Sequence, residues 1–124
     1  TPQKNKDLLV PINILEKEKD KKRNWRNAVN KTLKFEYKKI FNFIDKIIFL
    51  KVPSFKYVYT WRLLQEKKLK ITAKGKRIMK EGQLKNFIMY YERLTRHMLK
   101  NLQKTADVII KIDKKHRLKS IQFN

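Results

Sequence analysis

Two short apolar runs at residues 45–52 and 107–112, separated by a long stretch of helical pattern, constrain the fold of this chain most. Both runs are rich in β-branched residues, the first also holds an aromatic one, and Pro53 ends it. Continuous runs of this kind are typical of strands buried on both faces. Because parallel strands need a long crossover between them, the sequence predicts a parallel pair in a covered sheet and an α/β architecture.

Apolar residues at steps of three or four predict helices over residues 25–44, 54–69 and 84–102. Residues 1–24 hold a single apolar patch and a charged run, which favours a loop. Residues 70–83 lack a clean period, and we expect a mobile, basic connection there. A turn at residues 113–116 and a short strand at 117–123 predict a terminal hairpin at the sheet edge.

The length of 124 residues predicts one compact domain with a modest core. Two strands and a hairpin make only a small part of a stable covered sheet, so we expect residues 1–124 to form a single incomplete domain. The chain begins with Thr1 and not with methionine. This fits a truncated form that has lost an amino-terminal half.

The net charge of +22 points to nucleic acid or an anionic surface as a partner, since lysine and arginine gain from neutralising phosphates. However, 26 lysines and 7 arginines are spread along the whole chain, together with many Ile, Asn, Phe and Tyr residues. A+T-rich codons give such a composition, and we favour this explanation over a selected polyanion-binding surface, which would be concentrated on one face.

The absence of cysteine excludes disulfides, thiolate metal sites and cysteine nucleophiles. The two histidines, His97 and His116, are too few for a histidine-rich metal site. The longest apolar run, residues 47–50, is far shorter than the roughly 20 residues of a membrane span. With no secretory signal pattern at the start, the expected location is the cytoplasm.

The segment around Arg62 holds the first candidate for chemistry. Helical spacing places Arg62 one turn from Val58 and from Glu66, beside the packed face. By spacing alone, a surface salt bridge of Arg62 with Glu66 is the simpler interpretation. The alternative is an arginine on a lid, which neutralises charge on a phosphoryl group as the lid closes.

The segment 84–102 gives a second set of candidates. Glu92, Arg93, Arg96 and Lys100 lie opposite its apolar stripe and form a basic ridge, which is either an anion-binding surface or an ordinary solvated face. His97 is better explained as a packing residue than as a proton carrier.

These two segments resemble the lid and the following helix of the glycerate kinase-like P-loop kinases, a family that includes plant-type D-glycerate kinases and kinase-like bacterial proteins. The matching stretches are Tyr59-Thr-Trp-Arg-Leu-Leu-Gln-Glu-Lys-Lys-Leu69 and Tyr91-Glu-Arg-Leu-Thr-Arg-His97. The resemblance extends from about Pro11 to Arg117. It implies a partial P-loop NTPase fold, with a lid over about residues 54–102.

The resemblance also implies site residues and ligands. It implies that Arg62 is the catalytic phosphate contact, that Gln65 and Glu66 orient it or a substrate hydroxyl, and that Arg93 and Arg96 bind anions. It implies ATP-dependent phosphorylation of a small hydroxylated metabolite such as glycerate, with Mg²⁺. Asn13 and Glu16 either approach the acceptor substrate or tie down a loop, and the second interpretation is favoured. Trp25 and Trp61 are interpreted as packing anchors.

The sequence departs from the family in one respect that matters for activity. It contains no G-x-x-x-x-G-K-[ST] motif, and Gly75 and Gly82 are its only glycines. Without the groups that hold the β and γ phosphates, this chain alone is expected to be inactive as a kinase. The alternatives are a small α/β binding module and a basic protein that binds nucleic acid or an anionic surface.

Overall fold

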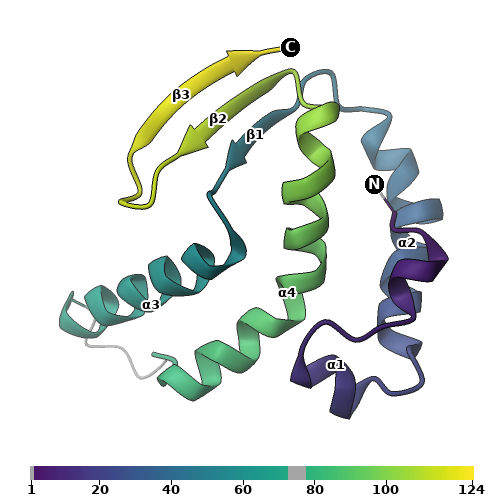
Figure 1. Cartoon of the computed structure of the whole chain (residues 1–124), viewed down its shortest axis with the longest axis horizontal. Coiled ribbons are helices and arrows are strands. Elements are labelled where there is room, and N and C mark those ends of the chain that lie inside the picture. The colour runs from purple at the N-terminus through teal and green to yellow at the C-terminus, as the bar shows by residue number, and fades with distance from the viewer. Residues whose placement is uncertain (1, 73–77) are drawn as a thin grey trace.

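The computed structural model describes residues 2–72 and 78–124 (Figure 1). Along the chain, the elements are η1 (Asn5–Leu8), α1 (Ile14–Lys19), α2 (Asn24–Phe41), β1 (Ile48–Lys51), α3 (Phe55–Thr72), α4 (Glu81–Asn101), η2 (Leu102–Lys104), β2 (Val108–Ile112) and β3 (Leu118–Phe123). The order of long helices and strands is the predicted one.

The strands form one sheet in the order β1-β2-β3. β1 pairs with β2 in parallel, and Phe49 lies opposite Ile109. β3 pairs with β2 in antiparallel fashion, which confirms the predicted hairpin. The crossover between β1 and β2 consists of α3 and α4, which extend away from the sheet and pack on each other (Figure 1). The α/β class and the parallel pair are therefore confirmed.

Two small buried apolar clusters hold the sheet and the helices α3 and α4 together. The first lies between the sheet and the end of α4, where Phe49, Ala106 and Ile109 are buried against Leu99 and Leu102. The second lies between α3 and α4, where Phe55, Leu84 and Ile88 are buried. The helix α4 contributes to both clusters and so links the sheet to the α3–α4 hairpin.

The expectation of strands buried on both faces is wrong. In β1, Phe49 is buried, but the neighbouring Ile48 and Leu50 are 64% and 61% exposed. The reason is that α4 and η2 cover only the sheet face that carries Phe49 and Ile109. Continuous apolar runs normally require a second layer, and the described part of the chain supplies none on the opposite face.

The expectation that residues 1–24 form only a loop is also wrong, because this segment contains η1 and α1. The Asn13 side chain caps α1 by accepting a hydrogen bond from the Glu16 N–H at 3.0 Å. The helix is too short to show an apolar period, so a cap and tertiary contacts specify it.

The expected connection at residues 70–83 is shorter in the structure, since α3 continues to Thr72 and α4 begins at Glu81. The Gln83 side chain accepts a hydrogen bond from the Lys80 N–H at 2.9 Å and fixes that start. The basic stretch Ala73-Lys-Gly-Lys-Arg77 lies outside the described residues. Within the described ranges, no helix is both long and apolar enough to cross a membrane.

Candidate functional site

The helix α3 follows β1 directly and carries Arg62 to a groove at the carboxyl ends of β1 and β2. The groove has a volume of about 620 Å³. It is lined by Leu50, Val52, Val58, Trp61, Arg62, Leu64, Gln65, Lys68, Ile112 and His116. The groove thus has an apolar floor with a cluster of cationic and amide groups on the α3 side. In open α/β sheets, ligands bind outside the carboxyl ends of the strands, which is the position of this groove.

Two side chains of the same helix contact the guanidinium of Arg62. Its Nη1 donates to Gln65 Oε1 at 2.8 Å, and its Nη2 forms an ion pair with Glu66 Oε1 at 2.7 Å. Glu66 is buried, and its other oxygen accepts the Met79 N–H at 3.2 Å. Gln65 and Glu66 therefore orient the Arg62 guanidinium, which has further N–H donors that can meet an anion. The salt bridge expected from spacing alone is present too, so both interpretations of Arg62 remain compatible with the geometry.

A ring contact joins α3 to the β2–β3 turn beside this groove. Trp61 stacks on His116 with ring centroids 4.3 Å apart and planes 22° apart. His116 has a positive φ of 63°, a backbone conformation that costs free energy in a residue other than glycine. Asp113 supports the turn by accepting hydrogen bonds from Lys115 and Arg117, and the hydrogen bond from the Arg117 N–H is the main reason that the pKa of Asp113 is lowered.

The sequence predicts a turn at residues 113–116, but it does not indicate that this turn lies beside the groove of Arg62. His116 follows a charged run with no period, and nothing in the sequence placed it against Trp61. A second groove of about 510 Å³ on the same turn gathers Lys51, Lys111, Lys114, Lys115, Arg117 and Lys119. The lysines in the three strands and in the turn were the available signal, but the even spread of lysine along the chain concealed it.

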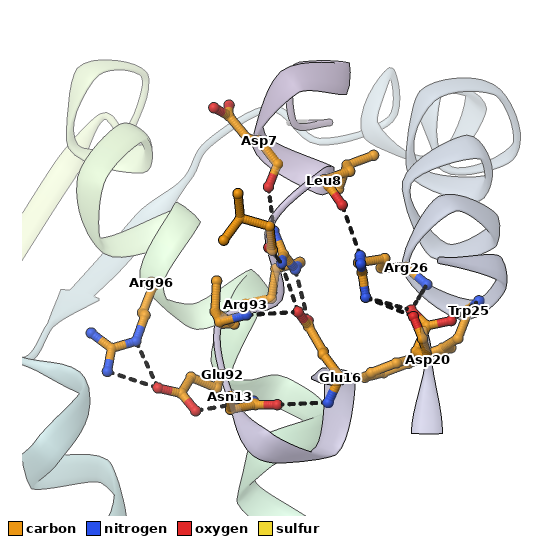
Figure 2. A network of polar contacts seen from close by, with 12 residues as sticks. Asp7, Leu8, Asn13, Glu16, Asp20, Trp25, Arg26, Glu92, Arg93 and Arg96 are labelled. Carbon is orange, nitrogen blue, oxygen red and sulfur yellow. Dashed lines mark hydrogen bonds and ion pairs between the residues drawn. The ribbon is translucent and has the colours of Figure 1, made fainter. Parts of the chain in front are cut away.

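Arg93 does not lie on the exposed basic ridge that the sequence predicts. The side chain is buried, and Figure 2 shows it enclosed by the amino-terminal segment. It donates to Glu16 Oε1 and Oε2 at 2.7 and 2.6 Å, and to the carbonyl oxygens of Asp7 and Val10 at 2.7 Å each. With its donors engaged in this way, Arg93 anchors residues 7–16 to α4.

Glu16 is the buried partner of Arg93 (Figure 2). Burial alone would raise the pKa of the Glu16 carboxyl. Hydrogen bonds from Arg93 and from the Ile12 N–H, with the charges of Arg93 and Arg26, outweigh burial and hold that pKa below its usual value of 4.5. Glu16 and the capping residue Asn13 thus act within the fold, in agreement with the loop-tying interpretation.

Arg26 and Asp20 form a second buried pair in the same network, which the sequence did not indicate. Arg26 Nη1 lies 3.1 Å from Asp20 Oδ2, and Arg26 Nε donates to the Leu8 carbonyl oxygen at 2.8 Å. The Asp20 carboxylate also accepts the N–H groups of Trp25 and Arg26 at the start of α2. This pair joins the amino-terminal segment to α2.

Arg96 remains more accessible, with 57% of its side chain exposed. It pairs with Glu92 Oε1 through Nε at 2.8 Å and Nη2 at 2.7 Å, and it lies over the Phe55 ring. Together with Lys4, Lys6, Lys100 and Lys104, it lines a basic groove of about 680 Å³. The groove of Arg96 is distinct from that of Arg62, so the structure does not bring all the candidate arginines together.

His97 lines the same groove as Arg96, and its Nδ1 lies 3.1 Å from Asn101 Nδ2 on the same helix. No cluster of three or more carboxylate or histidine side chains that could hold a metal ion occurs within residues 2–72 and 78–124.

The comparisons with known proteins bear on the architecture. In fold, the chain is similar to a D-glycerate 3-kinase. The solved structure is that of the protein from Cryptococcus neoformans var. grubii serotype A, and the TM-score is 0.68 at 21% sequence identity. The match covers 82% of this chain and 36% of the kinase chain, so this chain spans about a third of the neighbour. No protein-family model matches the sequence, and no curated protein matches it significantly.

The similarity confirms the predicted glycerate kinase-like fold over most of the chain. At 21% identity the similarity shows the fold alone, and it lends no support to the alternative of a polyanion-binding module.

Proposed function

We propose that this chain forms the lid and adjoining sheet of a kinase-like protein that transfers a phosphoryl group from ATP to a small, hydroxylated, glycerate-like metabolite. The observation that carries the proposal is the position of Arg62, which a crossover helix holds at the carboxyl ends of two parallel strands. The fold similarity to a D-glycerate 3-kinase supports it.

In this proposal, Arg62 is the catalytic residue. Phosphoryl transfer spreads negative charge over the oxygens of the transferring group, and a guanidinium placed on them stabilises that charge. Gln65 and Glu66 fix the direction of Arg62, so less ordering is needed when the substrate binds. Arg96 is the secondary anion contact, whereas Arg93 holds the amino-terminal segment in place.

ATP and Mg²⁺ are assigned in this proposal to residues outside these 124. The sequence lacks the loop that cradles the β and γ phosphates, and the described residues offer no three-ligand metal cluster. We therefore propose that residues 1–124 form an incomplete kinase-like domain, with its lid over about residues 54–102, that is inactive without a P-loop portion. The cytoplasmic location and the truncated form remain predictions.

A chimera tests the proposal. In the Cryptococcus D-glycerate 3-kinase, this chain replaces the matching segment, and transfer of phosphate from ATP to D-glycerate is measured. We expect transfer to occur and Arg62→Ala to lower the rate by about 10²–10³-fold, a typical loss for one group that stabilises transition-state charge. Lys70→Ala at the exposed end of α3 is the matched control and should leave the rate unchanged. A folded chimera in which both substitutions have equal effects would refute the role of Arg62.

A further inference from the structure

The turn between β2 and β3 carries a basic groove that is separate from the groove of Arg62. Its volume of about 510 Å³ is in the usual range for sites that bind small ligands. All three strands and the turn contribute cationic side chains to it, and these are Lys51, Lys111, Lys114, Lys115, Arg117 and Lys119. Among the described residues that line the groove, Asp113 alone is acidic. The positive charge is therefore concentrated at this place in the fold.

The carboxylate of Asp113 does not neutralise the lysines of this groove. Its Oδ2 accepts from Arg117 Nε at 3.1 Å and from Arg117 Nη2 at 2.9 Å. Its Oδ1 accepts the N–H groups of Lys115 and Arg117. The charge of Asp113 is thus committed to Arg117 and to the shape of the turn. Five lysines remain, and no carboxylate within the described residues forms an ion pair with any of them.

Lys51 and Lys111 are the least exposed of these cations. They lie opposite each other in the parallel register of β1 and β2, and both are half-buried. The Lys51 Nζ donates to Gln103 Oε1 on η2, a neutral partner that leaves the charge of Lys51 uncompensated. Like charges that lie side by side and are partly removed from water repel each other. An anion seated beside both lysines relieves this repulsion, so the pair favours a bound anion.

The number of cations indicates the class of anion. A single phosphate group carries a charge of about −1.5 to −2 at neutral pH, which is too small to balance five lysines. A chain of phosphoryl groups carries more charge and distributes it along its length, as the lysines of the groove are distributed over strands and turn. None of the described lining residues is aromatic, so a nucleotide base has no stacking platform here.

We propose that this groove is a binding site for an oligophosphate, a small anion with two or more linked phosphoryl groups and no base. Lys51 and Lys111 contact it from the sheet, and the exposed lysines of the turn add charge at the rim. Val52 and Ile112 line both this groove and the groove of Arg62, so the two grooves adjoin without sharing a cation. The site does not require phosphoryl transfer at Arg62, and its test is independent of the chimera.

Titration calorimetry of the full chain with inorganic triphosphate, at about 150 mM salt to screen weak surface attraction, tests the site. Lys51→Gln with Lys111→Gln should weaken binding by about tenfold or more, since each contact to a charged group is lost. The matched control, Lys38→Gln with Lys39→Gln at the exposed end of α2, removes the same charge outside the groove. It should leave the affinity unchanged. Equal weakening by the two pairs would mean that overall charge attracts the anion, and would overturn the proposal.

A second pair of substitutions tests the rim of the groove without disturbing the sheet. Lys114 and Lys115 are exposed, so Lys114→Gln with Lys115→Gln should leave the circular dichroism unchanged. We expect this pair to weaken triphosphate binding more than the control pair on α2 does. Unchanged affinity in the turn variant would show that the groove does not hold the anion, even if the substitutions in β1 and β2 disrupt the fold.

A series of anions tests the ligand class. Inorganic phosphate should bind about tenfold or more weakly than triphosphate, because it meets fewer lysines. ATP carries the same phosphate chain with a base, and it should bind no more tightly than triphosphate. Equal binding of phosphate, or tighter binding of ATP, would overturn the assignment to an oligophosphate without a base. Displacement of triphosphate by a single-stranded oligonucleotide at a lower concentration of phosphate groups would assign the groove to nucleic acid instead.

Discussion

Arg62 and Glu66 form an ion pair of 2.7 Å in which Glu66 is buried and Arg62 is partly exposed. Through its second oxygen, Glu66 also accepts the Met79 N–H, so one carboxylate orients the candidate catalytic arginine and holds the segment that precedes α4. The geometry of the proposed site and the packing of the α3–α4 hairpin thus depend on the same side chain.

The substitution Glu66→Gln tests this double role of the Glu66 carboxylate. The amide can still accept the Met79 N–H but leaves Arg62 without its anionic partner. We expect a loss of unfolding free energy of about 1–2 kcal/mol, below the full cost of breaking a buried pair because Arg62 is partly solvated. Urea unfolding measures it, and Glu36→Gln, on the exposed side of α2, should stay within about 0.5 kcal/mol of the parent. Equal effects of both substitutions would contradict the role of Glu66.

The anchor formed by Arg93 gives a second prediction. Arg93→Met leaves the buried Glu16 carboxylate without its hydrogen-bonded cation, and the expected loss of stability is about 3–5 kcal/mol. Arg96→Met removes an exposed pair on the same helix and should cost less than about 1 kcal/mol. Denaturant midpoints of the two variants give the comparison. Similar midpoints would mean that the Glu16–Arg93 pair does not anchor the amino-terminal segment.

The lowered pKa of Glu16 predicts a dependence of stability on acid. A carboxyl whose pKa is lower in the folded than in the unfolded chain stabilises the fold above its unfolded pKa. This contribution is lost as the pH falls through the folded pKa. The unfolding free energy should therefore decrease as the pH falls below about 4.5, the usual value for this group. Unfolding at several pH values should show a weaker decrease in Glu16→Gln, and an unchanged decrease would assign the effect to other carboxyls such as Asp113.

The positive φ of His116 predicts which of two substitutions at this position gives the more stable protein. His116→Ala loses the Trp61 stack and keeps a side chain at a φ of 63°, whereas His116→Gly loses the stack but relieves the backbone. We expect the glycine variant to be more stable than the alanine variant by about 1 kcal/mol. Thermal unfolding of both variants measures the difference, and the reverse order would show that the positive φ is not strained here.

The parts of the fold that local pattern decides could be predicted from the sequence. Residues at helical steps gave the three long helices, and the two apolar runs gave the parallel strands, because in both cases the period lies within one segment. The exposure of the sheet face that carries Ile48 and Leu50 could not be predicted in this way. Ile48 and Leu50 have the composition of buried residues, and only the absence of a covering layer among the described residues leaves them exposed.

The candidate site was predictable to a different degree for each residue. The contact of Arg62 with Glu66 follows from helical spacing, but the contact of Trp61 with His116 joins residues far apart in the chain. The sequence pattern puts Arg93 on a basic ridge, either an anion-binding surface or an ordinary solvated face, because the opposite side of α4 carries the apolar stripe. The segment that encloses Arg93 was expected to be a loop, so no partner for this guanidinium was foreseen.

The helix α4 joins three parts of the molecule. One end packs in the cluster of the α3–α4 hairpin, the other end packs against the sheet, and the amino-terminal segment grips the middle through Glu16 and Arg93. Residues 7–16 do not line the groove of Arg62, yet they are joined through this one helix to the hairpin that carries Arg62.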